Sequence, residues 1–175
     1  MAKLAPVPIR NFSRASGTLF RGAAPTESGI RFIRSLGIKT VIDLRAPGMM
    51  TRRECVYATN YDLNYFNIPV NYLRVSDTII AAFLAVSLHP RYQPTFIHCI
   101  GGDDRTGAMV AIYRAAVDGW PFNWAYTEML DHRFHPWQLF LLRDVKKFAQ
   151  RMKELDQQER MSALQQLVRE NLFTT

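Results

Sequence analysis

The sequence contains little cysteine: two residues, Cys55 and Cys99, in a chain of 175. So few cysteines exclude the disulfide framework of a small secreted domain and favour a reducing compartment. Long apolar runs are also missing, and none approaches the ~20 residues that a membrane-spanning helix needs. The chain opens with MAKLAPVPIRNFSRASG, which lacks the apolar core of a secretory leader. We therefore expect a cytoplasmic location and no membrane partner, although a leader already removed would leave the location open.

Acidic residues are in the minority, with 15 Asp and Glu against 22 Lys and Arg, a net charge of +7. This excess favours anionic ligands such as phosphates. The basic residues are spread along the chain rather than gathered in a block, which is typical of a solvated surface and predicts no nucleic-acid partner. The length suits a single domain over residues 1–175 with a sizeable core, which we expect to be a monomer.

Strands and helices alternate in the first half of the chain. The patterns predict strands at 18–22, 38–44, 63–70 and 95–99, and helices at 27–36, 54–61 and 76–88, the last capped by Ser76. From Thr106 onward the pattern is helical, with breaks at 119–121 and 135–136 and a packed helix pair over 143–170. The predicted fold class is α/β, a three-layer-like domain with a mostly parallel central sheet flanked by helices and a helical C-terminal half.

The segment FIHCIGGDDRTGAM, residues 96–109, joins a predicted strand to a predicted helix. Gly101 and Gly102 allow the backbone to curl with positive φ angles. A curled loop at a helix N-terminus points several N–H groups at one spot, which binds an anion such as phosphate. The same field favours a thiolate at Cys99. Arg105 can close the loop by gripping two phosphate oxygens.

A thiolate below a clamped phosphate is placed to attack phosphorus, which gives a phosphocysteine that water then hydrolyses. Thr106 can donate a hydrogen bond to the sulfur of Cys99, and His98 can orient the loop through its ring nitrogens. The opposing interpretation of Cys99 is an ordinary buried cysteine at the end of a strand. Cys55 is expected to be a packing or surface residue that could also form a disulfide with oxidised Cys99. The further residues expected to contact substrate are Ile100, Gly101, Gly102 and Asp103.

The stretch HCIGGDDRT resembles the signature HCxxGxxR(S/T) of the cysteine-dependent protein tyrosine phosphatase superfamily. The matching positions are His98, Cys99, Gly102, Arg105 and Thr106. Upstream, residues 19–45 resemble the amino-terminal pattern of small atypical dual-specificity phosphatases and PTP-like inositol-phosphate phosphatases, so that the likeness covers residues 17–130. It implies a metal-independent phosphatase or PTP-like phytase without a cofactor. Its substrate would be a phosphorylated small molecule such as an inositol polyphosphate, or a phosphoprotein that carries phosphotyrosine.

The chain departs from the resembled family at the general acid, an aspartate on a separate upstream loop that protonates the leaving oxygen. Here that region reads Asn71, Tyr72 and Leu73. Two carboxylates remain as candidates: Asp77, in the first turn of the next helix, and Asp104, because some branches of the superfamily carry an aspartate directly before the arginine. If neither serves, the chain is a catalytically weak phosphate-binding module, a pseudophosphatase. The aspartate of the adjacent pair that is not the acid is expected to weaken the positive field around the pocket, and Asp103 is the one that does not directly precede Arg105.

The segment DHRFHPW, residues 131–137, has a loosely metal-like spacing of Asp131, His132 and His135. No third ligand pattern accompanies it, so we expect a helix end at the pocket rim and no metal site. Arg21 and Arg45 are expected to be structural ion-pair partners.

Overall fold

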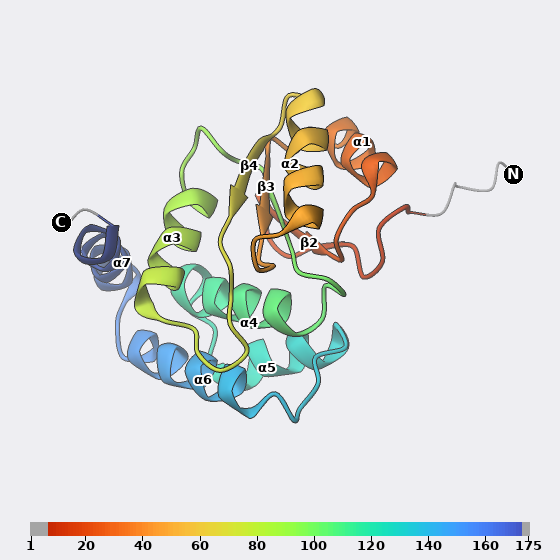
Figure 1. Ribbon diagram of the computed structural model, residues 1–175. Helices are drawn as coiled ribbons and strands as arrows, with labels where there is room; N and C mark the ends of the chain where they lie inside the picture. Colours follow the sequence, from red (N-terminus) through yellow and green to blue (C-terminus); the bar gives the residue numbers. More distant parts are fainter. Residues whose placement is uncertain (1–6, 173–175) are drawn as a thin grey trace, which may run out of the picture.

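The computed structural model of the chain describes residues 7–172 and contains a five-stranded mixed sheet within them (Figure 1). Its order is β1-β2-β5-β3-β4, and only the β1–β2 pair is antiparallel. The strands are β1 (Ser13–Arg14), β2 (Leu19–Gly22), β3 (Thr40–Asp43), β4 (Asn64–Asn67) and β5 (Thr95–His98). The strand that leads into the glycine loop, β5, therefore lies in the middle of the sheet.

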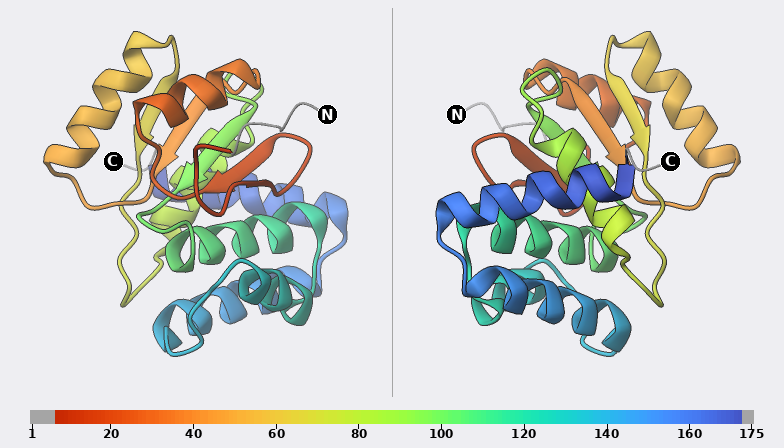
Figure 2. Two further views of the ribbon diagram at one scale, coloured as in Figure 1. Left: turned by 90° about the vertical axis from the view of Figure 1, so that its right-hand side faces the viewer. Right: turned by 90° about the vertical axis from the view of Figure 1, so that its left-hand side faces the viewer.

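Helices cover both faces of the sheet, as the side views in Figure 2 show. The helices are α1 (Glu27–Ser35), α2 (Met49–Asn60), α3 (Asp77–Ser87), α4 (Asp104–Tyr113), α5 (Phe122–Asp131), α6 (Leu139–Lys153) and α7 (Gln157–Leu172), with a π-helical turn η1 (Arg114–Asp118) after α4. The first two lie on one face of the sheet, and α3 with the helices from α4 onward lies on the other (Figure 1). The predicted α/β fold class and its helical second half are confirmed.

Two hydrophobic clusters fill the spaces between these layers. Successive side chains of a strand point to opposite faces. On β5, Phe96 packs into the cluster under α1 while Ile97 packs into the larger cluster under α3 and α4. On β3, Val41 packs into the cluster under α1 and Ile42 packs into the larger cluster. The sheet is thus buried on both faces, as a parallel sheet requires.

The elements differ from expectation mainly at their ends. Helix α2 begins at Met49, five residues before the predicted start, because the Thr51 hydroxyl accepts the Gly48 N–H and starts the helix there. Helix α4 begins at Asp104 rather than Thr106, so both adjoining aspartates lie at its N-terminus. The two-residue strand β1 was not predicted.

The two C-terminal helices form as expected, but they do not pack mainly on each other. Helix α7 lies along α3, where Leu164 is buried in the larger cluster (Figure 2). Among residues 7–172, no helix is both long enough and apolar enough to cross a membrane. The leader prediction concerns a segment that starts outside the described residues.

Candidate active site

The glycine loop follows β5 and ends at α4, with its backbone pressed against the end of β2. Gly102 has a φ of +77°, and a Cβ there would overlap the carbonyl group of Gly22. Only glycine fits a position that combines this conformation with this approach. The buried guanidinium of Arg21 donates to the Gly102 carbonyl at 3.2 Å and supports the loop from below.

Cys99 and Arg105 lie at the two ends of this loop, and both are largely buried. The guanidinium of Arg105 donates to the Leu44 carbonyl at 3.3 Å, while its Nε has no hydrogen-bond partner among the described residues. The Thr106 hydroxyl is likewise buried and unpartnered within that part of the chain. A buried donor without an acceptor is costly, so these groups suit an anion and a thiolate. The catalytic roles of the three residues remain predictions.

Tyr72 lies in the segment 71–73, where the resemblance leads one to expect the aspartate of the family. Its ring covers the Arg105 guanidinium at 4.8 Å from the ring centroid. Burial raises the pKa of Tyr72, and the charges of Arg105, Cys99 and Asp104 also act on it. These four side chains therefore lie in one neighbourhood.

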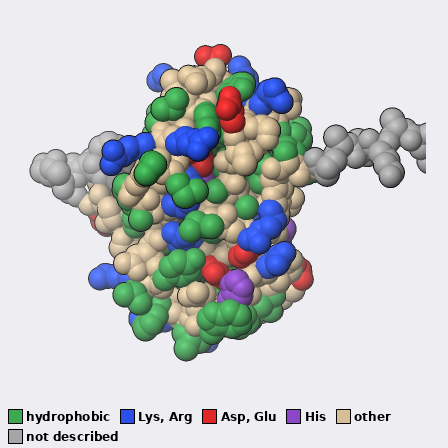
Figure 3. All heavy atoms as spheres, turned by 45° about the vertical axis from the view of Figure 1, so that its right-hand side comes forward, with side chains coloured by type: hydrophobic (Ala, Val, Ile, Leu, Met, Phe, Trp, Pro, Cys, Tyr) green, Lys and Arg blue, Asp and Glu red, His purple; other side chains and the backbone are tan. Residues whose placement is uncertain are grey.

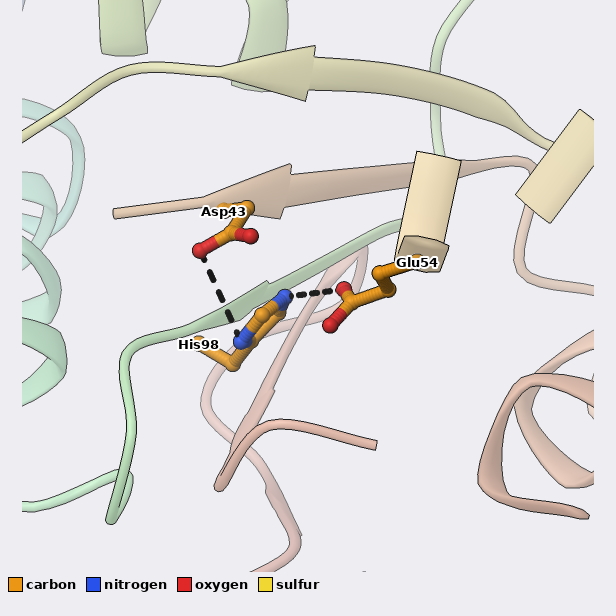
Figure 4. A group of neighbouring side chains, drawn as sticks. All are labelled: Asp43, Glu54 and His98. Carbon is orange, nitrogen blue, oxygen red and sulfur yellow. Dashed lines mark ion pairs between the residues drawn. The ribbon is translucent and has the colours of Figure 1, made fainter. Parts of the chain in front are cut away.

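His98 connects the loop to a buried group of charges, shown in Figure 4. Its Nδ1 lies 3.0 Å from the Cys99 carbonyl oxygen and 4.0 Å from Oδ1 of Asp43. Its Nε2 lies 2.6 Å from Oε1 of Glu54, a close ionic contact without the alignment of a hydrogen bond. Since a carbonyl oxygen only accepts, Nδ1 carries a proton. The ring thus contacts the backbone at Cys99, and its role in orienting the loop stays a prediction. Because the ring is fully buried, its side chain is not exposed to an incoming substrate, which does not favour the predicted contact with substrate.

Arg45 completes this network and confirms the prediction that it forms structural ion pairs. Its guanidinium bonds both oxygens of Asp43, the shortest contact being 2.6 Å, and reaches Glu54 at 2.5 Å. Burial alone would raise the pKa of Asp43, but hydrogen bonds from Arg45 and the charge of His98 outweigh it and lower the pKa. Burial alone would lower the pKa of Arg45, and its bonds to Asp43 and the charge of Glu54 raise it.

The same cluster has the composition of a metal site, because ligand atoms of Asp43, Glu54 and His98 lie within 4.8 Å of one another. The Arg45 guanidinium already bonds the carboxylates of both acidic residues. A cation placed there would be repelled by that guanidinium and would have to displace it. The residues fit a self-compensated charge network rather than a metal centre.

Arg21 does not form the structural ion pair that was predicted for it, since no residue of 7–172 pairs with it. Its guanidinium instead bonds the loop carbonyl of Gly102. Burial lowers its pKa to about 10, although the charges of Glu128 and Cys99 act in the opposite direction. A buried cation beside the loop adds to the positive field around Cys99.

The adjacent aspartates Asp103 and Asp104 are held in opposite directions. Asp103 pairs with Arg10 at 3.0 Å and accepts the Asn11 amide at 3.1 Å. Asp104 accepts the backbone N–H of His135 at 2.9 Å and lies 2.9 Å from Nδ1 of the same ring. Each carboxylate thus has its own partner, and Asp103 ties the loop to the N-terminal segment. Its predicted contact with substrate stays a prediction.

Asp77 lies away from the loop, in the first turn of α3. It pairs with Arg151 of α6 at 2.7 Å, and this hydrogen bond lowers the pKa of the carboxyl. It makes no hydrogen bond or ion pair with residues 98–106 among the described contacts. Its assignment as the acid stays a prediction that these contacts do not favour.

The two histidines after α5 do not converge on a metal. His132 faces Asn11, whose side-chain oxygen lies 3.1 Å from Nδ1, and burial lowers the pKa of this histidine. His135 faces Asp104 instead. The segment therefore contacts the start of α4 and the N-terminal segment, and its place at a pocket rim stays a prediction.

Sequence reasoning did not identify Glu54 or the partners of the two loop aspartates. One signal for Glu54 was available, because Thr51, Glu54 and Ala58 are spaced to share one helix face, and that face is buried. A glutamate at a core-facing position requires a cationic partner. No local spacing indicates the contacts of Arg10 or Asn11, which lie more than 90 residues from the loop in sequence.

Known proteins resemble this chain in sequence and fold. The family model described as DSP-PTPase phosphatase fused to NAD+ kinase matches residues 8–131. The dual specificity protein phosphatase TpbA of Pseudomonas aeruginosa is 28% identical over 123 residues, which cover 70% of this chain and 54% of TpbA. The chain thus spans about half the length of this relative.

Two solved structures share the fold. The core catalytic domain of the PP-IP phosphatase SIW14 from Saccharomyces cerevisiae, in complex with citrate, superposes with a TM-score of 0.70 at 17% identity, covering 94% of this chain and 98% of that one. A Cys-to-Ser variant of Pseudomonas aeruginosa TpbA in complex with pTyr gives a TM-score of 0.60 at 21% identity, covering 97% and 99% of the two chains.

Proposed function

This chain belongs to the PTP-NADK family, described as DSP-PTPase phosphatase fused to NAD+ kinase, and we propose that it is a metal-independent cysteine phosphatase. The observation that carries the proposal is the pairing of a buried Cys99 with a buried, unpartnered Nε of Arg105 across a glycine loop at a helix N-terminus. This arrangement offers a nucleophile and oxyanion donors at one spot.

The proposed reaction has two steps. The Cys99 sulfur attacks phosphorus, the bond from phosphorus to the ester oxygen breaks, and Arg105 with the loop N–H groups stabilises the charge on the phosphoryl oxygens. Water then attacks the phosphocysteine, and Thr106 donates to the departing sulfur. Nucleophile and charge stabilisation both come from the protein, so no step needs a metal ion.

We propose phosphotyrosine or another aryl phosphate as the preferred substrate. Exposed apolar side chains accompany the loop and its neighbours: Ile100 in the loop, Leu73 beside Tyr72, and Trp137 beside His135. On the face in Figure 3, hydrophobic side chains lie among basic ones. An apolar rim around a single anion site suits one phosphoryl group on an aromatic ring. The TpbA variant solved with pTyr supports this choice.

Inositol polyphosphate is the second candidate. The net charge of +7 and the likeness to a PP-IP phosphatase support it. The loop itself carries two carboxylates and Arg105 as its sole cation. A site for several phosphates would need more cations than this.

Phosphate release by the purified protein in the presence of a chelator tests both candidates. The substrates are nitrophenyl phosphate, a phosphotyrosine peptide and inositol hexakisphosphate, with Cys99→Ser as the control. We expect the unmodified chain to release phosphate and Cys99→Ser to release none. The turnover rate should be highest with the phosphotyrosine peptide. Faster turnover of inositol hexakisphosphate would select the second candidate.

A catalytically weak phosphate-binding module is the remaining alternative, favoured by the missing aspartate at positions 71–73. It predicts that Cys99→Ser still binds a phosphotyrosine peptide while the unmodified chain turns over none of the three substrates. That outcome would overturn the proposal that the chain is an enzyme.

A further inference from the structure

The contacts of Asp104 direct its carboxyl group at His135. Oδ1 accepts the backbone N–H of His135 and also lies 2.9 Å from Nδ1 of the ring, and Oδ2 lies 3.1 Å from the same nitrogen. An aspartate is ordinarily ionised near neutral pH and then only accepts hydrogen bonds. Nδ1, which faces both oxygens, is then the ring nitrogen that donates, and Nε2 is left for another partner.

Two other candidates for the acid are poorly suited. Asp77 is paired with Arg151, and its lowered pKa leaves it ionised near neutral pH. Tyr72 lies against the Arg105 guanidinium, but burial raises its pKa further above neutrality. An effective general acid has a pKa near the working pH, which neither group meets.

His135 is held at the rim with one nitrogen free. Its ring is fixed between Asp104 and the indole of Trp137, whose centroid lies 4.6 Å away. The side chain is 41% exposed, and its Nε2 makes no hydrogen bond with any described residue. Asp104, whose contact with the ring is observed, is the first residue of α4 and directly precedes Arg105 in sequence. The ring therefore presents a free nitrogen at the N-terminus of α4, next to the segment that carries Arg105.

We propose that His135 is the proton donor of this phosphatase and that Asp104 is its positioning residue. This inference rests on the proposed function. As the Cys99 sulfur bonds to phosphorus and the bond from phosphorus to the ester oxygen breaks, the Nε2 proton of the imidazolium moves to that oxygen and the alcohol leaves neutral. In the second step the neutral Nε2 takes a proton from the attacking water, which restores the imidazolium and releases phosphate and the free thiolate.

Leaving groups of different acidity test the proposal. Dinitrophenolate leaves without a proton, whereas the phenol of a tyrosine requires one. His135→Asn keeps an N–H that can face Asp104 but has no proton to transfer. We expect it to lower kcat/KM for phenyl phosphate by about 100-fold or more, and for dinitrophenyl phosphate by less than about fivefold. His89→Asn, in the turn after α3, is the matched control and should change neither.

The outcomes separate this proposal from the proposed function. Equal losses on both substrates, or a leaving-group-dependent loss in Tyr72→Phe or Asp77→Asn instead, would overturn the role of His135 while leaving the cysteine phosphatase intact. If the unmodified chain hydrolyses neither substrate in a Cys99-dependent way, the proposed function fails and the donor role with it.

A second measurement needs no turnover. The Nδ1–H proton of His135, followed by NMR, should exchange with water faster in Asp104→Asn, because the carboxylate that faces Nδ1 is gone. Asp104→Asn keeps the backbone acceptor and the shape of the side chain. Unchanged exchange of this proton would contradict the positioning role.

Discussion

Glu54 illustrates at the scale of one residue how the loop depends on buried charge. It reaches from α2 to His98 and to Arg45, and its side chain is almost fully buried (Figure 4). Together with Asp43, the network contains two carboxylates facing one guanidinium and one imidazole. Such a group is stable only while the charges compensate, since each ion has lost its hydration.

Replacing Glu54 by Gln removes one anion and leaves Arg45 and His98 with less compensation. We expect the free energy of unfolding to fall by about 3 kcal/mol, measured by urea denaturation. Glu154→Gln, on the exposed end of α6, is the control and should change it by less than about 0.5 kcal/mol. Equal behaviour of the two variants would contradict a charge network at this position.

The contribution of Asp43 to folding stability depends on pH and is lost in acid. Its pKa in the folded chain lies below the ordinary 3.8, so its contribution to stability is complete above that pH and is lost as pH falls through the folded-state pKa. The stability difference between the unmodified chain and Asp43→Asn should stay constant from about pH 7 to about pH 5 and shrink below the ordinary pKa. Urea midpoints across that range measure it. A difference that persists unchanged at acid pH would be inconsistent with the lowered pKa.

At the scale of an element, the glycine loop is shaped mainly by what lies around it. Gly102, in the middle of the loop, lies against the end of β2. Arg10 and Asn11 of the N-terminal segment donate hydrogen bonds to the loop carbonyls of Gly101 and Gly102. The strand, loop and helix could be predicted from the sequence because their signals are local in the chain. The contacts of Arg10 and Asn11 with the loop could not be predicted, because contacts between residues so distant in sequence produce no periodic pattern in it.

Gly102→Ala tests the close approach of this loop to β2. The added Cβ would overlap the Gly22 carbonyl in a conformation that other residues avoid, so the loop must shift. We expect binding of vanadate or phosphate to weaken by at least about tenfold, which corresponds to ~1.4 kcal/mol, measured by calorimetry. Gly17→Ala, whose Cβ would meet no atom within 4 Å, should bind as before. Unchanged affinity in Gly102→Ala would refute the predicted overlap.

On the scale of the whole molecule, the strand order builds the site. Because β5 lies between β2 and β3, the loop after it meets residues that follow both neighbours: Gly22 beside Gly102, and Leu44 beside Arg105. A site beyond the carboxyl ends of parallel strands could be predicted from the sequence. The strand order could not, so neither could the contacts to Gly22 and Leu44.

The net charge of +7 also acts at this scale. It should speed the encounter with phosphorylated substrates, and salt should screen that attraction. We expect kcat/KM for a phosphotyrosine peptide to fall about threefold or more between about 20 mM and about 300 mM NaCl. Alkylation of Cys99 by neutral iodoacetamide is the control and should change far less. An equal salt effect on both would show that salt acts on the thiol rather than on the encounter.

The most direct test of the account is to trap the covalent intermediate. The chain is mixed with a phosphotyrosine peptide carrying radiolabelled phosphate, quenched rapidly in acid and digested. A phosphocysteine intermediate predicts label on the peptide that contains Cys99, and none in Cys99→Ser. Turnover without label at Cys99, or turnover that survives in Cys99→Ser, would contradict it.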